Sequence, residues 1–243
     1  MTFDPFGDFE TRGYLRNVAR TKDTKIIRQL EHTSFTTGLD AAFTKLAARR
    51  KLTYEDVLGT HKILFEAVYP WAGEDRMANA PGIGVSKGPV LFARPDLIRR
   101  SVDYALEKGQ DKAFMLARPG EVMGHLAYAH PFLDGNGRTI MVVHSVLAHR
   151  AGFSVNWAAT DKTDYLNALT EEIENPKANA LNTYLKPFIT APVANNGLAA
   201  ALVAAPGLDG QSANTVAGQI SDPALQERYR AQELAREEVQ KQG

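Results

Sequence analysis

Two apolar segments separated by a short polar segment constrain the fold of this chain more than any other feature. The first runs from about Pro119 to His130, and the second is TIMVVHSVLAHRAGF, in which we expect the helix to end at Gly152. Their apolar content predicts two helices, the second of them buried. The segment between them, PFLDGNGR, combines Pro, Asp, Asn and Gly, which are typical of turns. We therefore expect a dense loop between two apolar helices.

Helical periodicity is also found in other parts of the chain. Thr53 is a candidate N-cap, and Val57, His61, Leu64 and Val68 follow it at spacings that place them on one buried helical face. Further helices are expected at residues 39–50, from Pro95 onward with Ile98, Val102 and Ala105 on one face, and at residues 163–174 and 178–188.

One segment has strand character instead. In GIGVSKGPVLFA, two short β-prone pieces at Gly84–Ser86 and Val90–Phe92 are joined by Lys87-Gly88-Pro89, which is typical of a turn. The sequence therefore predicts an all-α fold with one small β-hairpin.

Composition divides the chain into four parts. Residues 1–35 mix aromatics, charges and glycine without a clean period, so we interpret them as an N-terminal arm with short helical pieces. Residues 36–190 hold the helical domain. Residues 191–220 are rich in Ala, Gly and Asn, which predicts a linker that buries little apolar surface. Residues 221–243 are expected to form a charged helix.

This last helix begins after Ser221-Asp222-Pro223, a typical helix start. Its apolar stripe is thin, since it consists of Leu225, Tyr229 and Val239. We therefore expect a solvated tail helix rather than a docking surface.

Composition excludes several classes of protein. The chain has 243 residues, with 28 Lys and Arg against 28 Asp and Glu, and it has no cysteine. The lack of cysteine excludes a disulfide scaffold, Cys-ligated zinc, iron–sulfur clusters and thiol catalysis. Balanced charge gives no general electrostatic reason for binding nucleic acid or an anionic membrane. Because no stretch approaches the roughly 18 apolar residues of a membrane span, we expect a soluble protein of a cytosol-like compartment.

The segment from His130 to Arg138 concentrates the groups of a phosphate site. Gly135 and Gly137 allow the backbone to turn its N–H groups toward one hollow, and the helix that starts near Arg138 directs its N-terminal dipole there too. Arg138 adds a positive fork that suits phosphate oxygens. Asp134 would repel phosphate but suits Mg²⁺, which prefers one or two carboxylates together with phosphate oxygens. His130 is then a candidate general base at the edge of the site.

Each of these residues alone is more often structural, because Asp-Gly and Asn-Gly are ordinary turn formers and a lone histidine is usually not catalytic. Their joint occurrence between two apolar helices favours the functional interpretation. The sequence predicts a nucleotide-phosphate site with a base beside it.

The segment HPFLDGNGR resembles the signature of the Fic (filamentation induced by cyclic AMP) family, HxFx[D/E]GNGRxxR. The resemblance extends to LTYEDVLGTHKILFEAVYPWAGEDR, which is similar to the family's helix ending in a WAG-type turn, and to GPVLFARPDLI, which is similar to its flap hairpin and the helix after it. It covers about residues 1–190. The resemblance implies a Fic-type helical bundle with one small β-hairpin flap, followed here by a partly flexible C-terminal tail.

The activity that the resemblance implies is transfer of AMP from Mg-ATP to a Tyr, Ser or Thr hydroxyl of a target protein, with release of pyrophosphate. In this family-based assignment, His130 deprotonates the target hydroxyl, and Asp134 holds the Mg²⁺ that bridges the α- and β-phosphates. The nucleotide phosphates are bound by Gly135, Asn136, Gly137 and Arg138.

The flap is the second implied site. By the resemblance, the segment around Lys87–Phe92 binds the target by adding the target backbone as a strand. Lys87 and Phe92 are therefore the candidate target-binding residues, and Phe92 matches the hydrophobic position that clamps the target side chain. Phe132 matches a phenylalanine that anchors the motif in the core.

The chain departs from the family pattern at one position. The second arginine of the signature, which helps to bind the distal phosphates of ATP, is replaced by Met141. Losing such a charged contact costs about 1.5–3 kcal/mol. Lys87 and Arg76 are considered as substitutes, although a surface charge is the expectation for both. Another donor (UMP, phosphocholine or phosphate) and a catalytically weakened Fic-fold binding module stay open as alternatives.

Regulation and location follow from the resemblance only in outline. Thr170–Asn175 fits the letters of the family's inhibitory motif, [S/T]xxxE[G/N], but we expect it inside a core helix, and its expected partner position holds Met141. A separate small antitoxin-like inhibitor is therefore expected, with an enzyme that is unrestrained until it meets a target as the alternative. Family members act on bacterial topoisomerases as toxins or on host small GTPases as effectors. A bacterial cytoplasmic protein, or one secreted into a host or recipient cell, is implied.

Overall fold

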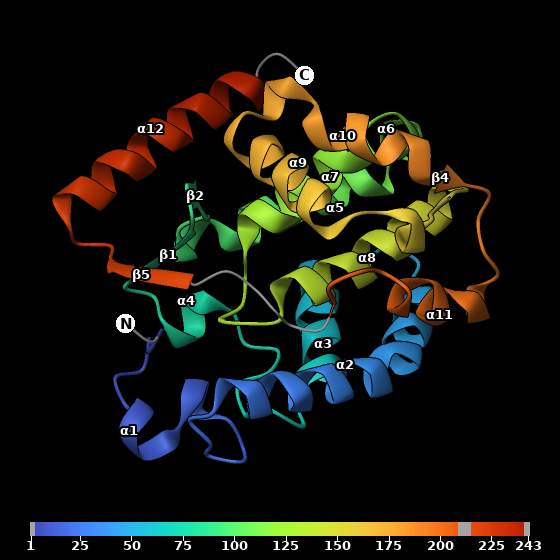
Figure 1. Cartoon of the computed structure of the whole chain (residues 1–243). Helices are drawn as coiled ribbons and strands as arrows, with labels where there is room; N and C mark the ends of the chain where they lie inside the picture. The colour runs from blue at the N-terminus through green and yellow to red at the C-terminus, as the bar shows by residue number, and fades with distance from the viewer. Residues whose placement is uncertain (1–2, 209–214, 241–243) are drawn as a thin grey trace.

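The two apolar segments form helices α7 (Pro119–Ala129) and α8 (Asn136–Ala151) at the centre of the molecule (Figure 1). The computed structural model describes residues 3–208 and 215–240, and side chains are described up to residue 236. Helix α8 is surrounded by α2, α3, α5, α6, α7 and α11, so it lies at the core of a helical bundle. The predicted all-α fold and the loop between α7 and α8 are confirmed.

The remaining helices are α1 (Phe9–Arg12), α2 (Thr24–Ala47), α3 (Tyr54–Phe65), α4 (Arg76–Asn79), α5 (Ile98–Gln110), α6 (Lys112–Ala117), α9 (Lys162–Glu174), α10 (Ala180–Leu185), α11 (Leu198–Val203) and α12 (Pro223–Gln240). Short 3-10 helices lie at Tyr14–Arg16, Pro95–Leu97, Trp157–Ala159, Pro176–Ala178, Lys186–Phe188 and Asn195–Gly197. The strands are β1 (Ile83–Lys87), β2 (Val90–Leu91), β3 (Ser154–Val155), β4 (Ile189–Thr190) and β5 (Thr215–Gln219). None of the described helices is both long enough and apolar enough to span a bilayer.

Helix α3 begins where the sequence predicts it. The side chain of Asp56 accepts a hydrogen bond from the Thr53 amide at 3.0 Å, which satisfies one of the free N–H groups at the helix start. The residues predicted to share its buried face, Val57, His61, Leu64 and Val68, are all buried. This part of the prediction is confirmed.

Helix α2 begins much earlier than predicted. We expected a helix at residues 39–50, but Asp23 caps a helix that starts at Thr24, and the boundary placed at residue 35 falls inside it. The buried face of α2 contains Glu31 among apolar residues: Ile27, Phe35, Leu39, Ala42, Phe43 and Leu46. A charged residue inside the apolar stripe hid the helical period, so residues 24–35 looked irregular.

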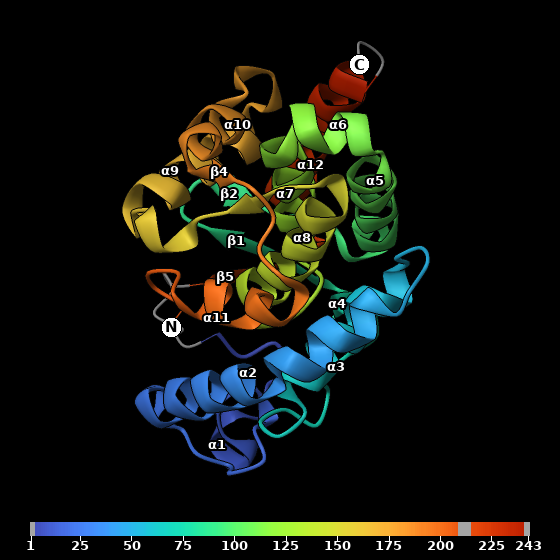
Figure 2. The same cartoon turned by 90° about the vertical axis from the view of Figure 1, so that its right-hand side faces the viewer.

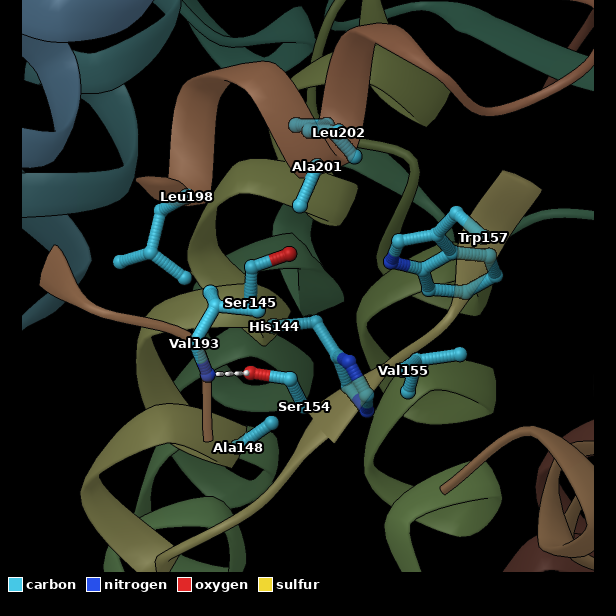
Figure 3. A pocket seen from close by; sticks show the side chains of 10 residues that line it. All are labelled: His144, Ser145, Ala148, Ser154, Val155, Trp157, Val193, Leu198, Ala201 and Leu202. Atoms are coloured by element: carbon cyan, nitrogen blue, oxygen red, sulfur yellow. Dashed lines mark hydrogen bonds between the residues drawn. The ribbon is translucent and has the colours of Figure 1, made fainter. Parts of the chain in front are cut away.

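The expected linker is also more ordered than its composition indicates. Within it, α11 buries Leu198 and Leu202 against the core, and Figure 3 shows them beside His144, Ser154 and Trp157. The amide of Val193 donates to Ser154 Oγ at 3.1 Å and fixes the segment before α11. Residues 209–214 of the expected linker lie outside the described residues. The residues labelled in Figure 3 line a small pocket between α11 and α8, and none of the predicted site residues lines it.

The hairpin is confirmed, but it belongs to a larger sheet. Strands β1 and β2 pair antiparallel as predicted, and β5, from the expected linker, pairs antiparallel with the other edge of β1. The strand order is therefore β2-β1-β5 (Figure 1). We refer to these three strands as the flap sheet.

One face of the tail helix packs against the rest of the protein, so the expected tail helix without a docking surface is wrong, although most of its described residues are exposed. Tyr229 of α12 is only 1% exposed, and it packs where Gly84 of β1 has no side chain, since a Cβ there would lie 2.7 Å from Tyr229 Oη. The Arg236 guanidinium lies 3.4 Å from the centre of the Tyr128 ring. Figures 1 and 2 show α12 running from β5 along the outer side of the flap sheet toward α9 and α7. The side chain of Val239 lies outside the described ones.

Candidate active site

His130 lies directly after α7, where its left-handed backbone (φ 42°) ends the helix. Its ring stacks on Phe92 with 3.7 Å between ring centres and 15° between planes, so the flap covers the histidine. Burial, together with the charges of Lys87 and Arg76, holds the pKa of His130 well below its usual value. The imidazole is therefore neutral near pH 7, which is the state that a proton acceptor needs.

Arg76 holds the backbone of His130 in this position. It is fully buried; its Nε donates to the His130 carbonyl at 2.7 Å and its Nη2 to the Ala93 carbonyl at 2.6 Å. Its expected surface location is therefore wrong. These carbonyls engage Nε and Nη2 of Arg76, whereas its Nη1 has no hydrogen-bond partner among the described residues. Met141, at the position of the second arginine of the signature, is buried in the core.

Hydrogen bonds between Asn136 and Phe132 fix the loop after His130. Asn136 Oδ1 accepts from the Phe132 amide at 2.8 Å, and Asn136 Nδ2 donates to the Phe132 carbonyl at 2.7 Å. The side chain of Asn136 therefore shapes the loop, which differs from the expected side-chain contact with phosphate. Phe132 is buried, as predicted, and its ring stacks on His61 at 3.7 Å.

His61 was not predicted to belong to the site. Its Nδ1 accepts from the Gly73 amide at 3.0 Å, so its Nε2 carries the proton and donates to the Asp134 carbonyl at 3.1 Å. Burial lowers the pKa of His61 to about 3, which keeps it neutral. A histidine on the predicted buried face of α3 was the available signal, and its role is to position the loop at Asp134.

The N-terminus of α8 opens into an unfilled space. The first hydrogen bond of this helix runs from Thr139 N–H to the Gly135 carbonyl at 3.0 Å, so the amides of the preceding turn have no helical acceptor. At Gly137, no heavy atom would lie within 4 Å of an added Cβ. Arg138 is 6% exposed, and its Nη1 has no hydrogen-bond partner among the described residues. Free amides, the helix dipole and an unpaired guanidinium nitrogen together suit an anion.

Gly135 plays a different part from Gly137. Its φ of 75° is left-handed, and a Cβ there would lie 2.5 Å from the Phe65 ring. Its amide donates to Asp134 Oδ1 at 2.6 Å, so this amide is already engaged. Of the two glycines, Gly137 is the one that borders open space.

Arg138 is paired with a residue that the sequence did not point to. Its Nη2 donates to Glu31 Oε2 of α2 at 2.9 Å and lies 3.9 Å from Asp134 Oδ1. Tyr69 donates to the other Glu31 oxygen at 2.7 Å. Burial and the Asp134 charge raise the pKa of Glu31 to about 7, although Arg138 opposes this rise. The available signal was a glutamate within an apolar helical stripe.

Asp134 fits the single carboxylate of a phosphate-bound Mg²⁺. Its side chain is 28% exposed, and Tyr14 donates to Oδ2 at 3.4 Å. Among the described residues no group of three or more His, Asp or Glu side chains could form an all-protein metal site. One accessible carboxylate beside an anion hollow is what Mg²⁺ requires when phosphate oxygens supply its other ligands.

The predicted residues thus form two neighbouring groups. His130, Phe92 and Lys87 meet at the flap sheet, since Phe92 stacks on the histidine and the Lys87 charge acts on it. Asp134, Gly137 and Arg138 meet at the start of α8. The edge of β1 that does not pair with β2 is occupied by β5, so among the described strands β2 and β5 are the outer strands of the flap sheet.

Known proteins resemble this chain in sequence. Residues 51–148 match the Fic/DOC family. The protein adenylyltransferase VbhT of Bartonella schoenbuchensis is 27% identical over 177 residues, which are 69% of this chain and 35% of VbhT. The protein adenylyltransferase Fic of Drosophila willistoni is 25% identical over 153 residues, which are 60% of this chain and 30% of that protein. The chain thus spans about a third of the length of these two relatives.

Solved structures resemble it in fold. BepC of Bartonella tribocorum, a VirB-translocated effector with bound AMPPNP, has a TM-score of 0.56 and 16% identity over 73% of this chain and 92% of that one. The N-terminal Fic domain of a Bep effector of Bartonella quintana, with bound ADP, has a TM-score of 0.59 and 20% identity over 74% of this chain and 92% of that one. The family match and these folds agree with the resemblance found in the sequence: residues 51–148 are similar to the Fic/DOC family, and the fold is similar to that of the Bartonella Fic domains.

Proposed function

We propose that this protein transfers AMP from ATP to a hydroxyl side chain of a protein and releases pyrophosphate. The observation that carries the proposal is a neutral, flap-covered His130 next to an open helix N-terminus at Gly137 and Arg138. In the reaction His130 takes the proton of the acceptor hydroxyl. The hydroxyl oxygen bonds to the α-phosphorus, and the bond from that phosphorus to the leaving pyrophosphate breaks.

The remaining residues bind and neutralise the nucleotide. Arg138 and the amides at the start of α8 bind phosphate oxygens, since they offer unpaired donors in a nearly buried place. Asp134 would hold Mg²⁺, which neutralises phosphate charge when bound. The side chains of Asn136 and His61 position the loop. The adenylyltransferase names of VbhT and of the Drosophila protein support AMP as the transferred group.

Partners and location belong to the same proposal. We propose a hydroxyl-bearing target protein, of the topoisomerase or small GTPase type, and a small antitoxin-like inhibitor. A target strand would pair at the flap sheet near Lys87 and Phe92, after displacing β5 from the edge of β1. The Bartonella effectors of similar fold support action in a host or recipient cell after secretion, beside action in the bacterial cytoplasm. We further propose that the predicted helical domain, residues 36–190 extended to the start of α2 at Thr24, carries the catalytic unit, to which residues 191–220 and 221–243 attach.

Following the α-phosphate and the γ-phosphate of ATP separately tests the proposal. Purified protein, Mg²⁺ and a cell lysate are incubated with ATP labelled at either the α- or the γ-phosphate. We expect protein-bound label from α-labelled ATP alone, because the γ-phosphate leaves with pyrophosphate. Label from γ-labelled ATP alone would indicate phosphate transfer and contradict the proposal. UTP and CDP-choline, each tested as donor in place of ATP, identify a different transferred group if only they give modified protein.

A further inference from the structure

A glutamine of α12 connects the two parts of the protein that bring Phe92 and His130 together. Gln232 Nε2 donates to the Leu91 carbonyl at 2.6 Å, and Gln232 Oε1 accepts from the Tyr128 hydroxyl at 3.4 Å. Leu91 directly precedes Phe92 in the flap sheet. Tyr128 lies in the last turn of α7, two residues before His130. We refer to these two hydrogen bonds, which join the flap to the end of α7, as the Gln232 bridge.

The Leu91 carbonyl is available to Gln232 because it points away from β1. The Phe92 amide donates to the Val85 carbonyl at 3.1 Å, which makes Val85 and Phe92 a hydrogen-bonded pair. Bonded and non-bonded pairs alternate along an antiparallel ladder, and the backbone groups of a non-bonded residue point outward. Leu91, which lies opposite Ser86, is such a residue. Gln232 therefore satisfies a carbonyl that the pairing of β1 with β2 leaves free.

Two further contacts hold α12 in the position that the bridge needs. Tyr229 packs over Gly84 of β1, where a Cβ would lie 2.7 Å from Tyr229 Oη. One turn beyond Gln232, Arg236 donates to the Ile173 carbonyl of α9 at 2.6 Å. Helix α12 is thus fixed to the flap sheet on one side of Gln232 and to the helical core on the other.

The stack of Phe92 on His130 depends on how the flap lies against α7. The Ala93 amide donates to the Tyr128 carbonyl at 2.9 Å, which is one link between the two elements. The Gln232 bridge is a second link, made from the side of α12. Because this stack covers the imidazole of His130, a looser flap would admit water to it.

We propose that Gln232 is a positioning residue, which joins the flap to α7 and thereby holds Phe92 against His130 in the geometry that AMP transfer requires. This inference rests on the proposed function, because it concerns the same candidate base. Gln232 acts through the flap and α7 and not by contact with the reacting atoms. The tail helix is then a working part of the site, although it lies about a hundred residues after the loop that carries the base.

The pKa of His130, measured by NMR on the purified full chain without ATP or target, tests the bridge. Gln232→Met removes both hydrogen bonds but keeps an unbranched, uncharged side chain that favours a helix. Loosening the flap hydrates the ring and moves the Lys87 charge away, and both changes raise the pKa, while Arg76 stays on the His130 carbonyl. We expect the pKa of His130 to rise in Gln232→Met toward about 6.5, the value of an exposed histidine.

The rate of AMP transfer gives a second readout. In Gln232→Met we expect kcat for transfer to protein to fall about twofold to tenfold at pH 8, the usual net contribution of a hydrogen bond. The loss should be larger at pH 6.5, because part of the His130 population is then protonated in the variant. ATP affinity should stay unchanged, whereas a general loss of structure would weaken it too. A rate above that of the wild type would show that α12 restrains the flap, and it would overturn the proposal.

Matched variants separate the bridge from other effects of α12. Gln226 is exposed on the same helix, so Gln226→Met makes the same substitution outside the bridge and should leave the pKa of His130 and the rate unchanged. Tyr128→Phe removes only the longer of the two hydrogen bonds, so it should change both quantities less than Gln232→Met does. The NMR signal of His130 is assigned by its absence in His130→Ala.

A pair of glycine variants tests the docking of α12 independently. Gly84→Ala places a Cβ within 2.9 Å of side chains of α12 and displaces them, whereas a Cβ at Gly82 has no heavy atom nearer than 3.9 Å. We expect Gly84→Ala to raise the pKa of His130 as Gln232→Met does, and Gly82→Ala to leave it unchanged. The same pKa in both glycine variants would contradict a role of α12 in holding the flap.

The two readouts also separate this inference from the proposed function. If the wild type attaches AMP to protein, but Gln232→Met has the pKa of His130 and the rate of the wild type, the inference is wrong and the proposed function stands. If the pKa rises in Gln232→Met but the wild type attaches no AMP to protein, the proposed function fails, and the part of the inference that concerns AMP transfer fails with it.

Discussion

Replacing His130 with alanine is expected to slow AMP transfer by about 10²–10⁴-fold, the usual contribution of a general base. ATP affinity should stay nearly unchanged, because the phosphate donors belong to the start of α8 and not to His130. Since the pKa of His130 is lowered, wild-type activity should not fall when the pH is reduced from 8 to 6.5. Initial rates of α-label incorporation across this pH range, and separate ATP-binding titrations, measure both effects.

His149→Ala is the matched control. His149 is half-buried on α8, and its ring contacts the Val193 carbonyl at 3.0 Å, away from the loop after α7. This variant should keep the wild-type rate. A His130→Ala rate within a factor of about two of wild type would contradict the assignment of the base, since such a change is far below the contribution expected of one.

Replacing Arg138 with alanine is expected to destabilise the fold by about 3–5 kcal/mol, because it leaves Glu31 buried without its ion-pair partner. The loss should be larger at pH 8 than at pH 5. Burial already raises the pKa of Glu31 in the folded protein, and without Arg138 this pKa rises further. Folding then favours the protonated carboxyl, so the free energy of unfolding falls as the pH rises toward that pKa. Urea unfolding at the two pH values measures the free energy of unfolding directly.

The double variant Glu31→Gln with Arg138→Ala separates this pair from other effects. Glutamine is uncharged, so the double variant leaves no buried charge without a partner. It should therefore regain much of the lost stability, and its remaining loss of stability should not depend on pH. ATP affinity, by contrast, should stay about tenfold to a hundredfold weaker, because the phosphate contact is still missing. Additive losses in the two single variants and the double variant would show that Glu31 and Arg138 do not interact.

Local signals in the sequence were sufficient for the central elements. The Thr53 cap and the apolar spacing after it located α3, and the Lys87-Gly88-Pro89 turn located the hairpin. The loop between α7 and α8 was recognisable because its Pro, Gly, Asn and Asp residues interrupt two apolar helices. In each of these cases the information lies within a few residues of the element itself.

The remaining elements depend on contacts between distant parts of the chain. β5 has little strand character of its own, and it is ordered by pairing with β1, more than a hundred residues earlier. Tyr229 looked like part of a thin stripe, yet it is buried because Gly84 leaves room for it. Helix α2 was shortened in the prediction because Glu31 interrupts its apolar stripe, and its partner Arg138 lies on α8.

The same distinction applies to the candidate site. His130, Asp134, Gly137 and Arg138 follow one another in the loop and could be grouped from the sequence. Which of their neighbours position them could not. Glu31, His61, Tyr69 and Arg76 come from α2, from α3, from the segment after α3 and from α4, and they reach the loop only through the tertiary fold.

Measuring pyrophosphate and protein-bound AMP in the same reaction tests the central claim most directly. With wild-type protein, Mg²⁺ and ATP, the account predicts one pyrophosphate released for each AMP that becomes attached to a protein hydroxyl, and both products formed about 10²–10⁴-fold more slowly with His130→Ala. Release of ADP with phosphate on protein, or of pyrophosphate without protein-bound AMP, would contradict it.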